Sequence, residues 1–206
     1  MVRVKVCGLT SVSDAQLIAE LGFHLMGFIF ADSPRQVKAS EVKEIIKRVP
    51  SRVQKVGVFV NEKPDKVLSI ASYCGLDLVQ LHGDETPAYC NRLQREGLRI
   101  IKAFRVKDQT SLKGLSEFRQ EGVDFFLLDS HHPHRRGGTG STFDWRMIMG
   151  LEDRIFLAGG LRPDNLFKAV KKVNPYALDL NSGVEIKPGK KDPVLLRRVA
   201  EILFDS

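Results

Sequence analysis

The chain has 206 residues, of which 43% are hydrophobic and 28% charged, and these values are ordinary for one soluble globular domain with a substantial core. No apolar run is long enough to span a bilayer, which argues against an integral membrane protein. The formal net charge is +7, but Lys and Arg are spread along the chain without a long run and without interleaved aromatic residues, which argues against nucleic-acid binding.

The first predicted element is a strand at residues 3–7, where polar and apolar side chains alternate. This segment lacks the apolar block and cleavage site of a signal peptide, so we expect a cytoplasmic protein. The cysteines Cys7, Cys74 and Cys90 are odd in number and have no CxxC spacing. They indicate reduced thiols rather than a disulfide framework or a zinc site.

A unit of amphipathic helix, turn residue and short apolar strand recurs along the chain. Gly22, Gly75, Gly97 and Gly122 mark four of the joints between helix and strand, and Pro175 marks a fifth. Glycine suits these joints because it adopts the left-handed conformation that ends a helix. The predicted strands are residues 3–7, 25–30, 54–60, 76–82, 99–104, 123–129, 154–158 and 176–180.

Strict alternation of strands and helices predicts an α/β protein with a parallel sheet. Eight such units that close on themselves form a (βα)8 TIM barrel, and we expect residues 1–206 to be a single catalytic domain of this kind. The alternative is a doubly wound open sheet, which normally has fewer strands and a glycine-rich fingerprint after the first one. Here the first strand runs into residues 7–10 (CGLT), which lack that fingerprint.

Glycines follow the last two predicted strands, which run into Gly159-Gly160 and into Ser182-Gly183. In barrels of this class the active site lies at the carboxyl ends of the strands, and a phosphate commonly binds between the loops after strands seven and eight. Glycine lets backbone N–H groups approach an anion, and the Ser182 hydroxyl can donate as well. Either turn alone could be an ordinary tight turn. Two of them at the two expected strand ends predict a phosphate site.

Two titratable residues end strands: Cys7 ends the first and Asp129 ends the sixth. A thiolate and a carboxylic acid that meet in one pocket can move protons on either side of a sugar. The thiol would then need a lowered pKa, helped by nearby positive charge. Taken singly, a buried cysteine and a helix-capping aspartate are the simpler interpretations. If Cys7 points into the barrel mouth, strand alternation turns Lys5 inward, and we expect Asp179 to be the partner of this ammonium.

Three more residues at strand ends are candidates for substrate binding. Arg35 follows the second strand, and its planar guanidinium suits a carboxylate or phosphate, although a solvated loop charge is the simpler interpretation. Gln80 and His82 share one face of the fourth strand because side chains alternate with a period of two. A lone histidine in such a position is more often structural.

The longest irregular stretch, residues 130–142, follows the sixth strand and contains His131, His132 and His134. Such a cluster is a conceivable metal site. However, Arg135 and Arg136 follow directly and disfavour a cation. We therefore predict no metal.

Short stretches from residue 5 to residue 192 resemble phosphoribosylanthranilate isomerases of tryptophan biosynthesis. Each stretch is short, but their order and spacing are specific, and together they span nearly the whole chain. They are residues 5–10 (KVCGLT), 27–30 (GFIF) with 33–35 (SPR), 56–61 (VGVFVN), 79–83 (VQLHG), 127–130 (LLDS), 137–140 (GGTG) with 143–145 (FDW), 158–161 (AGGL), and 182–185 (SGVE) with 188–192 (PGKKD).

The resemblance implies an Amadori rearrangement of N-(5-phosphoribosyl)anthranilate to 1-(2-carboxyphenylamino)-1-deoxyribulose 5-phosphate. It makes Asp129 the general acid and Cys7 the general base, and it places Arg35 against the anthranilate moiety. The glycine turns would hold the phosphate. We also expect Gln80, His82 and Asp179 to bind the substrate, and no cofactor is needed because the substrate iminium accepts the electrons.

The resemblance also sets the partners and the rival functions. We expect a small phosphorylated substrate, no nucleic-acid or membrane partner, and a monomer or homodimer. The rival enzyme is the related histidine-pathway aldose–ketose isomerase, which has an aspartate where Cys7 stands. The rival from another class is a non-catalytic basic binding protein.

Overall fold

The computed structural model describes residues 2–130 and 142–204 and contains a closed barrel of eight parallel strands. Neighbours in the chain pair with each other, and β1 pairs with β8 to close the barrel. The predicted barrel is therefore confirmed and the open sheet is excluded. The strands are β1 (Arg3–Cys7), β2 (Leu25–Ile29), β3 (Gln54–Phe59), β4 (Leu78–Leu81), β5 (Ile100–Val106), β6 (Phe125–Ser130), β7 (Ile155–Leu157) and β8 (Ala177–Leu180).

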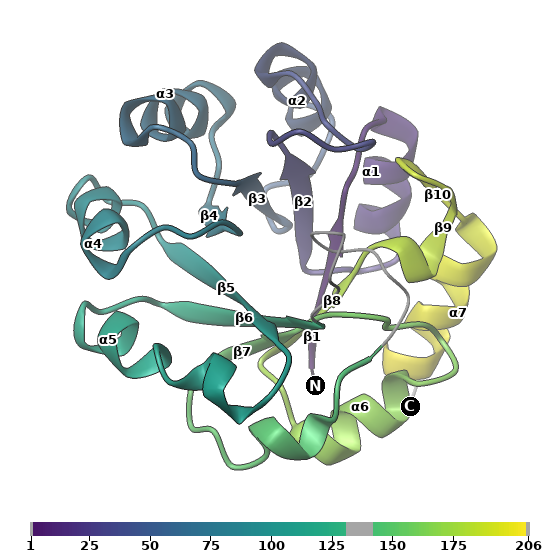
Figure 1. Ribbon diagram of the computed structural model, residues 1–206. Coiled ribbons are helices and arrows are strands. Elements are labelled where there is room, and N and C mark those ends of the chain that lie inside the picture. Colours follow the sequence, from purple (N-terminus) through teal and green to yellow (C-terminus); the bar gives the residue numbers. More distant parts are fainter. Residues whose placement is uncertain (1, 131–141, 205–206) are drawn as a thin grey trace.

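Helices surround the barrel on its outside (Figure 1). They are α1 (Val12–Glu20), α2 (Ala39–Ile46), α3 (Pro64–Cys74), α4 (Pro87–Arg95), α5 (Leu115–Gln120), α6 (Leu166–Val173) and α7 (Pro193–Phe204), with 3-10 turns η1 (Gln109–Leu112), η2 (Trp145–Ile148) and η3 (Ser182–Val184). Between β6 and β7 the described residues hold only η2, so the regular helix expected there is absent from residues 142–154. None of the helices in the described ranges is long and apolar enough to cross a membrane.

Left-handed residues end the helices where the glycine pattern predicts them. Gly22, Gly75, Gly97 and Gly122 all have φ between +71° and +85°. At the fifth joint the left-handed residue is Asn174, with φ 48°, rather than the predicted Pro175. Asparagine tolerates this conformation, and the proline that follows it cannot continue the helix.

Strand alternation divides the apolar side chains into two cores. One fills the space between strands and helices, and the other lies inside the barrel and includes Ile101, Ala103 and Phe156. The rings of Phe125, Phe156 and Tyr176 pack together with centroids 5.0 to 5.6 Å apart. Phe125 and Tyr176 lie at the amino ends of β6 and β8, so the interior is filled at that end and a site can form only at the other.

Candidate active site

A cavity of about 1160 Å³ opens at the carboxyl ends of the strands. Every predicted site residue except Gly183 lines it: Cys7, Arg35, Gln80, His82, Asp129, Gly159, Gly160, Asp179 and Ser182. Residues that are up to 175 positions apart in the sequence therefore share one space because parallel strands end at the same edge of the barrel.

Two glycine turns form one wall of this cavity. Gly159 and Gly160 have φ of 84° and 62°, and a Cβ on Gly159 would lie 2.6 Å from the backbone nitrogen of Ser130. Only glycine therefore lets the turn after β7 approach the end of β6. Ser182, at the start of η3, contributes the neighbouring part of this wall.

Gly183 has a packing role instead of facing the cavity. A Cβ at this position would overlap the carbonyl oxygen of Leu161, which follows the other turn. Glycine here brings the turns after β7 and β8 into direct contact, so it shapes the wall without lining it.

The thiol of Cys7 shares its surroundings with a buried ion pair. Lys5 Nζ lies 2.8 Å from Asp179 Oδ1, which is the pairing predicted from strand alternation, and the Lys5 side chain is fully buried. A Cβ on Gly27 would lie 2.7 Å from Cys7 Sγ and 3.1 Å from Lys5 Nζ. The absence of a side chain at Gly27 in β2 therefore provides the space that the thiol and the ammonium occupy.

Burial and nearby charges act in opposite directions on the pKa values of Cys7 and Lys5. Burial raises the pKa of the Cys7 thiol, and the positive charges of Lys5 and Lys191 oppose this without reversing it. The role of a base would need a lowered thiol pKa, and here the pKa is instead raised. Burial would lower the pKa of Lys5, but Asp179 and Cys7 outweigh it and the pKa of Lys5 is raised, so Lys5 remains a cation.

A second chain of charges runs along the same side and was missed by sequence reasoning. The guanidinium of Arg35 donates to both carboxylate oxygens of Glu185, at 2.9 and 2.6 Å, and Lys191 Nζ lies 2.8 Å from Glu185 Oε1. Burial would raise the pKa of Glu185, but the bonds from Arg35 and Lys191 lower it overall. The short hairpin of β9 (Glu185–Lys187) and β10 (Lys190–Lys191) brings the two together. Adjacent lysines after a turn are typical of surface charge, so no local signal marks Lys191 as buried.

The carboxyl of Asp129 lies in a different environment. Burial raises its pKa to about 6, and the charge of Asp179 acts in the same direction. His82 Nε2 lies 3.7 Å from Asp129 Oδ2, and Gln80 Nε2 lies 2.9 Å from His82 Nδ1. Asp179 also acts to raise the pKa of Cys7. Its carboxyl is thus close enough to influence both predicted catalytic groups.

Apolar side chains line the cavity near Arg35. Phe30, Val58 and Ile186 all contribute to the lining, and the ring of Phe30 stacks on Phe59 with centroids 5.0 Å apart. A flat apolar group of a ligand fits this part of the cavity, while polar groups converge on the rest.

Metal binding finds no support in the part of the chain that the structure describes. No group of three His, Cys, Asp or Glu side chains there could hold an ion. The histidines His131, His132 and His134 lie outside the described residues, as do the neighbouring Arg135 and Arg136.

Comparisons with known proteins agree with this geometry. A family model described as N-(5'-phosphoribosyl)anthranilate (PRA) isomerase matches residues 4–202. The chain is 47% identical to N-(5'-phosphoribosyl)anthranilate isomerase of Citrifermentans bemidjiense over 97% of this chain and 95% of that one. It superimposes on phosphoribosyl anthranilate isomerase from Thermotoga maritima with a TM-score of 0.90, 38% identity and 98% coverage of both chains.

Another solved structure is of a phosphoribosyl anthranilate isomerase in complex with reduced 1-(o-carboxyphenylamino)-1-deoxyribulose 5-phosphate. Its TM-score to this chain is 0.87, with 36% identity over 98% of this chain and 97% of that one.

Proposed function

We propose that this chain, which belongs to the phosphoribosylanthranilate isomerase family of tryptophan biosynthesis, works by an Amadori rearrangement with Asp129 as general acid and Cys7 as general base. The single observation that carries the proposal is that the ends of β1 and β6 contribute these two groups to one cavity. The carboxyl of Asp179 lies near enough to affect both. Proton removal and proton donation can then act on one small substrate.

In the first step Asp129 protonates the ring oxygen of the furanose. The bond between this oxygen and C1 breaks, and the lone pair of the anthranilate nitrogen forms a C1=N double bond, which gives an iminium. The raised pKa of Asp129, about 6, supports this role because it keeps part of the population in the acid form near neutral pH. The carboxylate that remains lies beside His82, whose Nε2 is 3.7 Å away.

In the second step the Cys7 thiolate takes the proton from C2. The electron pair of the C–H bond forms a C1=C2 double bond, and the electrons of the C1=N bond return to nitrogen. The product is an enolamine, which tautomerises to the 2-ketone. The iminium accepts the electron pair, so the residues of this chain need only move protons.

The surroundings of Cys7 support its role as a base although burial raises its pKa. Lys5 and Lys191 both favour the thiolate. The iminium formed in the first step brings another positive charge to the same region, and a nearby opposite charge favours the ionised form of an acid. The thiolate therefore becomes most stable when the intermediate that it must deprotonate is present.

The remaining side chains orient the two ends of the substrate. Gly159, Gly160 and Ser182 suit the phosphate because glycine turns expose backbone donors. Glu185 engages Nε and one Nη of Arg35, while the other Nη donates to none of the described residues. That nitrogen is directed to the anthranilate carboxylate in our proposal, with the ring against the apolar wall formed by Phe30 and Ile186.

Anthranilate fluorescence tests the function, because it decays as the substrate is converted. Wild type should convert phosphoribosylanthranilate but not the histidine-pathway aldose substrate. Cys7→Ala and Asp129→Asn should each lower turnover by about 10² to 10⁴-fold, since each removes one general acid or base. Cys74→Ala, which removes a buried thiol in α3 outside the cavity, is the matched control and should keep turnover. Turnover within tenfold of wild type for either of the first two variants would contradict the assignment.

A further inference from the structure

A second buried ion pair lies next to the active site without facing it. Lys102 Nζ and Glu85 Oε2 are 2.8 Å apart, and the two side chains are 3% and 1% exposed. Neither residue lines the cavity. Lys102 alternates with Ile101 and Ala103 of the inner core, and its ammonium lies within 5.9 Å of the Phe104 and Phe118 ring centroids in the outer core.

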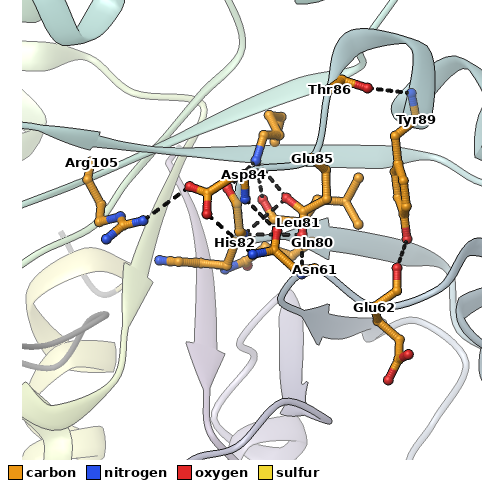
Figure 2. A network of polar contacts seen from close by, with 12 residues as sticks. Asn61, Glu62, Gln80, Leu81, His82, Asp84, Glu85, Thr86, Tyr89 and Arg105 are labelled. Carbon is orange, nitrogen blue, oxygen red and sulfur yellow. Dashed lines mark hydrogen bonds and ion pairs between the residues drawn. The ribbon is translucent and has the colours of Figure 1, made fainter.

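Both charges of this pair bind the backbone next to His82, Lys102 on both sides of it and Glu85 on one side. Figure 2 shows Glu85 close to Leu81, His82 and Asn61 in this network. Lys102 Nζ donates to the carbonyl oxygens of Leu81, at 3.3 Å, and Gly83, at 2.8 Å. Glu85 Oε2 accepts from the Gly83 N–H at 3.0 Å. The residue before His82 and the residue after it are therefore tied to one buried ion pair.

The same carboxylate also binds the loop after β3. Glu85 Oε1 accepts from the backbone N–H of Asn61 at 2.8 Å, and Asn61 Oδ1 accepts from the backbone N–H of Asp84 at 2.6 Å. Asn61 has φ 50°, and a Cβ on Gly83 would overlap Asn61 Oδ1 and lie 2.7 Å from Glu85 Oε1. The two loops interlock so tightly that residue 83 must be glycine.

Stability alone does not account for this arrangement. Removing two charges from water costs several kcal/mol, and apolar side chains of similar volume often serve as well or better. Apart from their contact with each other, Lys102 donates to the backbone carbonyls of Leu81 and Gly83, and Glu85 accepts from the backbone N–H groups of Gly83 and Asn61. Such a pair fixes geometry rather than adding much to the free energy of unfolding.

The Glu85–Lys102 pair holds the loop that contacts the neighbours of Asp129. If Gln80 Nε2 donates to His82 Nδ1, the imidazole proton is on Nε2, the atom 3.7 Å from Asp129 Oδ2. Asp84, on the loop that the pair holds, lies 3.6 Å from Arg105, and the charge of Arg105 lowers the pKa of Asp129. His82 and Arg105, the two side chains that lie beside Asp129 on this side of the cavity, thus both have contacts to this loop.

We propose that the Glu85–Lys102 pair is a positioning device for the acid: it holds His82 and Arg105 against the carboxylate that Asp129 becomes after it gives up its proton. Glu85 and Lys102 are positioning residues, because they act through the loop and do not touch the substrate. The inference rests on the proposed role of Asp129 as the general acid.

The first test is Glu85→Gln, which keeps the shape of the side chain but turns an amide N–H towards Lys102. The kcat should fall about tenfold to a hundredfold, because a small misplacement of a group at the reacting centre costs that much. The KM should change by less than about threefold, because the phosphate and anthranilate contacts lie on other loops.

A second measurement reports on His82 without any turnover. In the full chain labelled with ¹⁵N-histidine, and with signals assigned by a His82→Asn variant, free wild type should show His82 as the Nε2–H tautomer. Glu85→Gln should show a mixture of tautomers. A merely structural pair would leave this signal unchanged.

Two more variants guard against a general loss of structure. Asp77→Asn removes the carboxylate that pairs with buried Lys55 at the amino ends of β3 and β4. Because these ends lie away from the cavity, the variant should leave both kcat and the His82 signal at their wild-type values. Asn61→Gly keeps the left-handed backbone without strain and leaves the Asn61 N–H bond to Glu85 in place. It removes the two side-chain hydrogen bonds to Asp84, one to its backbone N–H and one to its carboxylate, so it should lower kcat less than Glu85→Gln does.

Unchanged kcat and an unchanged His82 tautomer in folded Glu85→Gln would overturn the inference, as would an equal kcat loss in Asp77→Asn. Failure of the proposed function looks different, because Asp129→Asn would then keep its turnover. If Glu85→Gln does not fold, the His82 signal and kcat of Asn61→Gly decide: values equal to those of wild type would count against the inference.

Discussion

The two sides of the cavity place different charges around their titratable groups, although burial raises the pKa of both. Around Cys7 the structure gathers cations, Lys5 and Lys191, each paired with a carboxylate. Around Asp129 the dominant influence is burial, which favours the neutral acid. A base must reach its charged form and an acid must keep its proton, so the contrast matches the two roles proposed for these residues.

The contrast also shows how a general acid and a general base can share one cavity. Asp179 disfavours the anionic form of both groups. On the Cys7 side Lys5, whose Nζ lies 2.8 Å from Asp179 Oδ1, opposes that effect. On the Asp129 side the charge of Arg105 opposes it without reversing the rise in the pKa. The charges around the two groups therefore differ in the direction that their proposed roles require.

The largest expected effect concerns the burial of Asp129. Its pKa is raised from 3.8 to about 6, so the folded state holds this proton to a higher pH than the unfolded state does. The resulting stabilisation is complete below about pH 4 and is lost as the pH rises through about 6, a change worth about 3 kcal/mol.

Asp129→Asn lacks this titration, so its free energy of unfolding should rise relative to wild type between pH 4 and pH 8 by up to about 3 kcal/mol. Urea unfolding of both proteins across this pH range measures the difference. Two parallel curves would contradict a buried, acid-favouring environment for Asp129.

A smaller effect is expected on the other side of the cavity. Lys191→Met removes one cation near Cys7, while Arg35 still binds Glu185 and limits the cost to folding. The thiol pKa should rise, so kcat/KM should fall about tenfold near neutral pH and recover as the pH increases.

Lys190→Met is the matched control for this variant, because Lys190 is the exposed neighbour in the same hairpin. It should leave the pH profile of kcat/KM as in wild type. An unshifted acidic limb in Lys191→Met would show that Lys191 does not stabilise the thiolate.

Features set by local sequence patterns could be predicted, whereas contacts between distant loops could not. The eight strands, the four glycine joints and the Lys5–Asp179 pair follow from period-two alternation and local turn chemistry, and the structure confirms them. The close contact of Gly183 with Leu161 was not predicted, because the approach of two loops is not encoded in either loop alone, and its phosphate-binding role stays a prediction.

The partners of two buried lysines could not be predicted, because the paths of a hairpin and a loop bring them into contact. The partner of Lys191 comes through a hairpin, and the partner of Lys102 comes from the loop after β4. Alternation around Ile101 and Ala103 indicates that Lys102 faces outwards under the helices, but it cannot identify Glu85. The raised thiol pKa likewise reflects burial in three dimensions, which a motif does not measure.

The central claim is that Cys7 and Asp129 act on one substrate, and a crystal structure of this chain with the reduced product analogue tests it most directly. We predict that Cys7 Sγ contacts the C2 end of the analogue and that the Asp129 carboxyl lies about 2.6 to 3.2 Å from the hydroxyl derived from the ring oxygen. An analogue bound in the cavity with either side chain out of reach of these atoms would contradict the account.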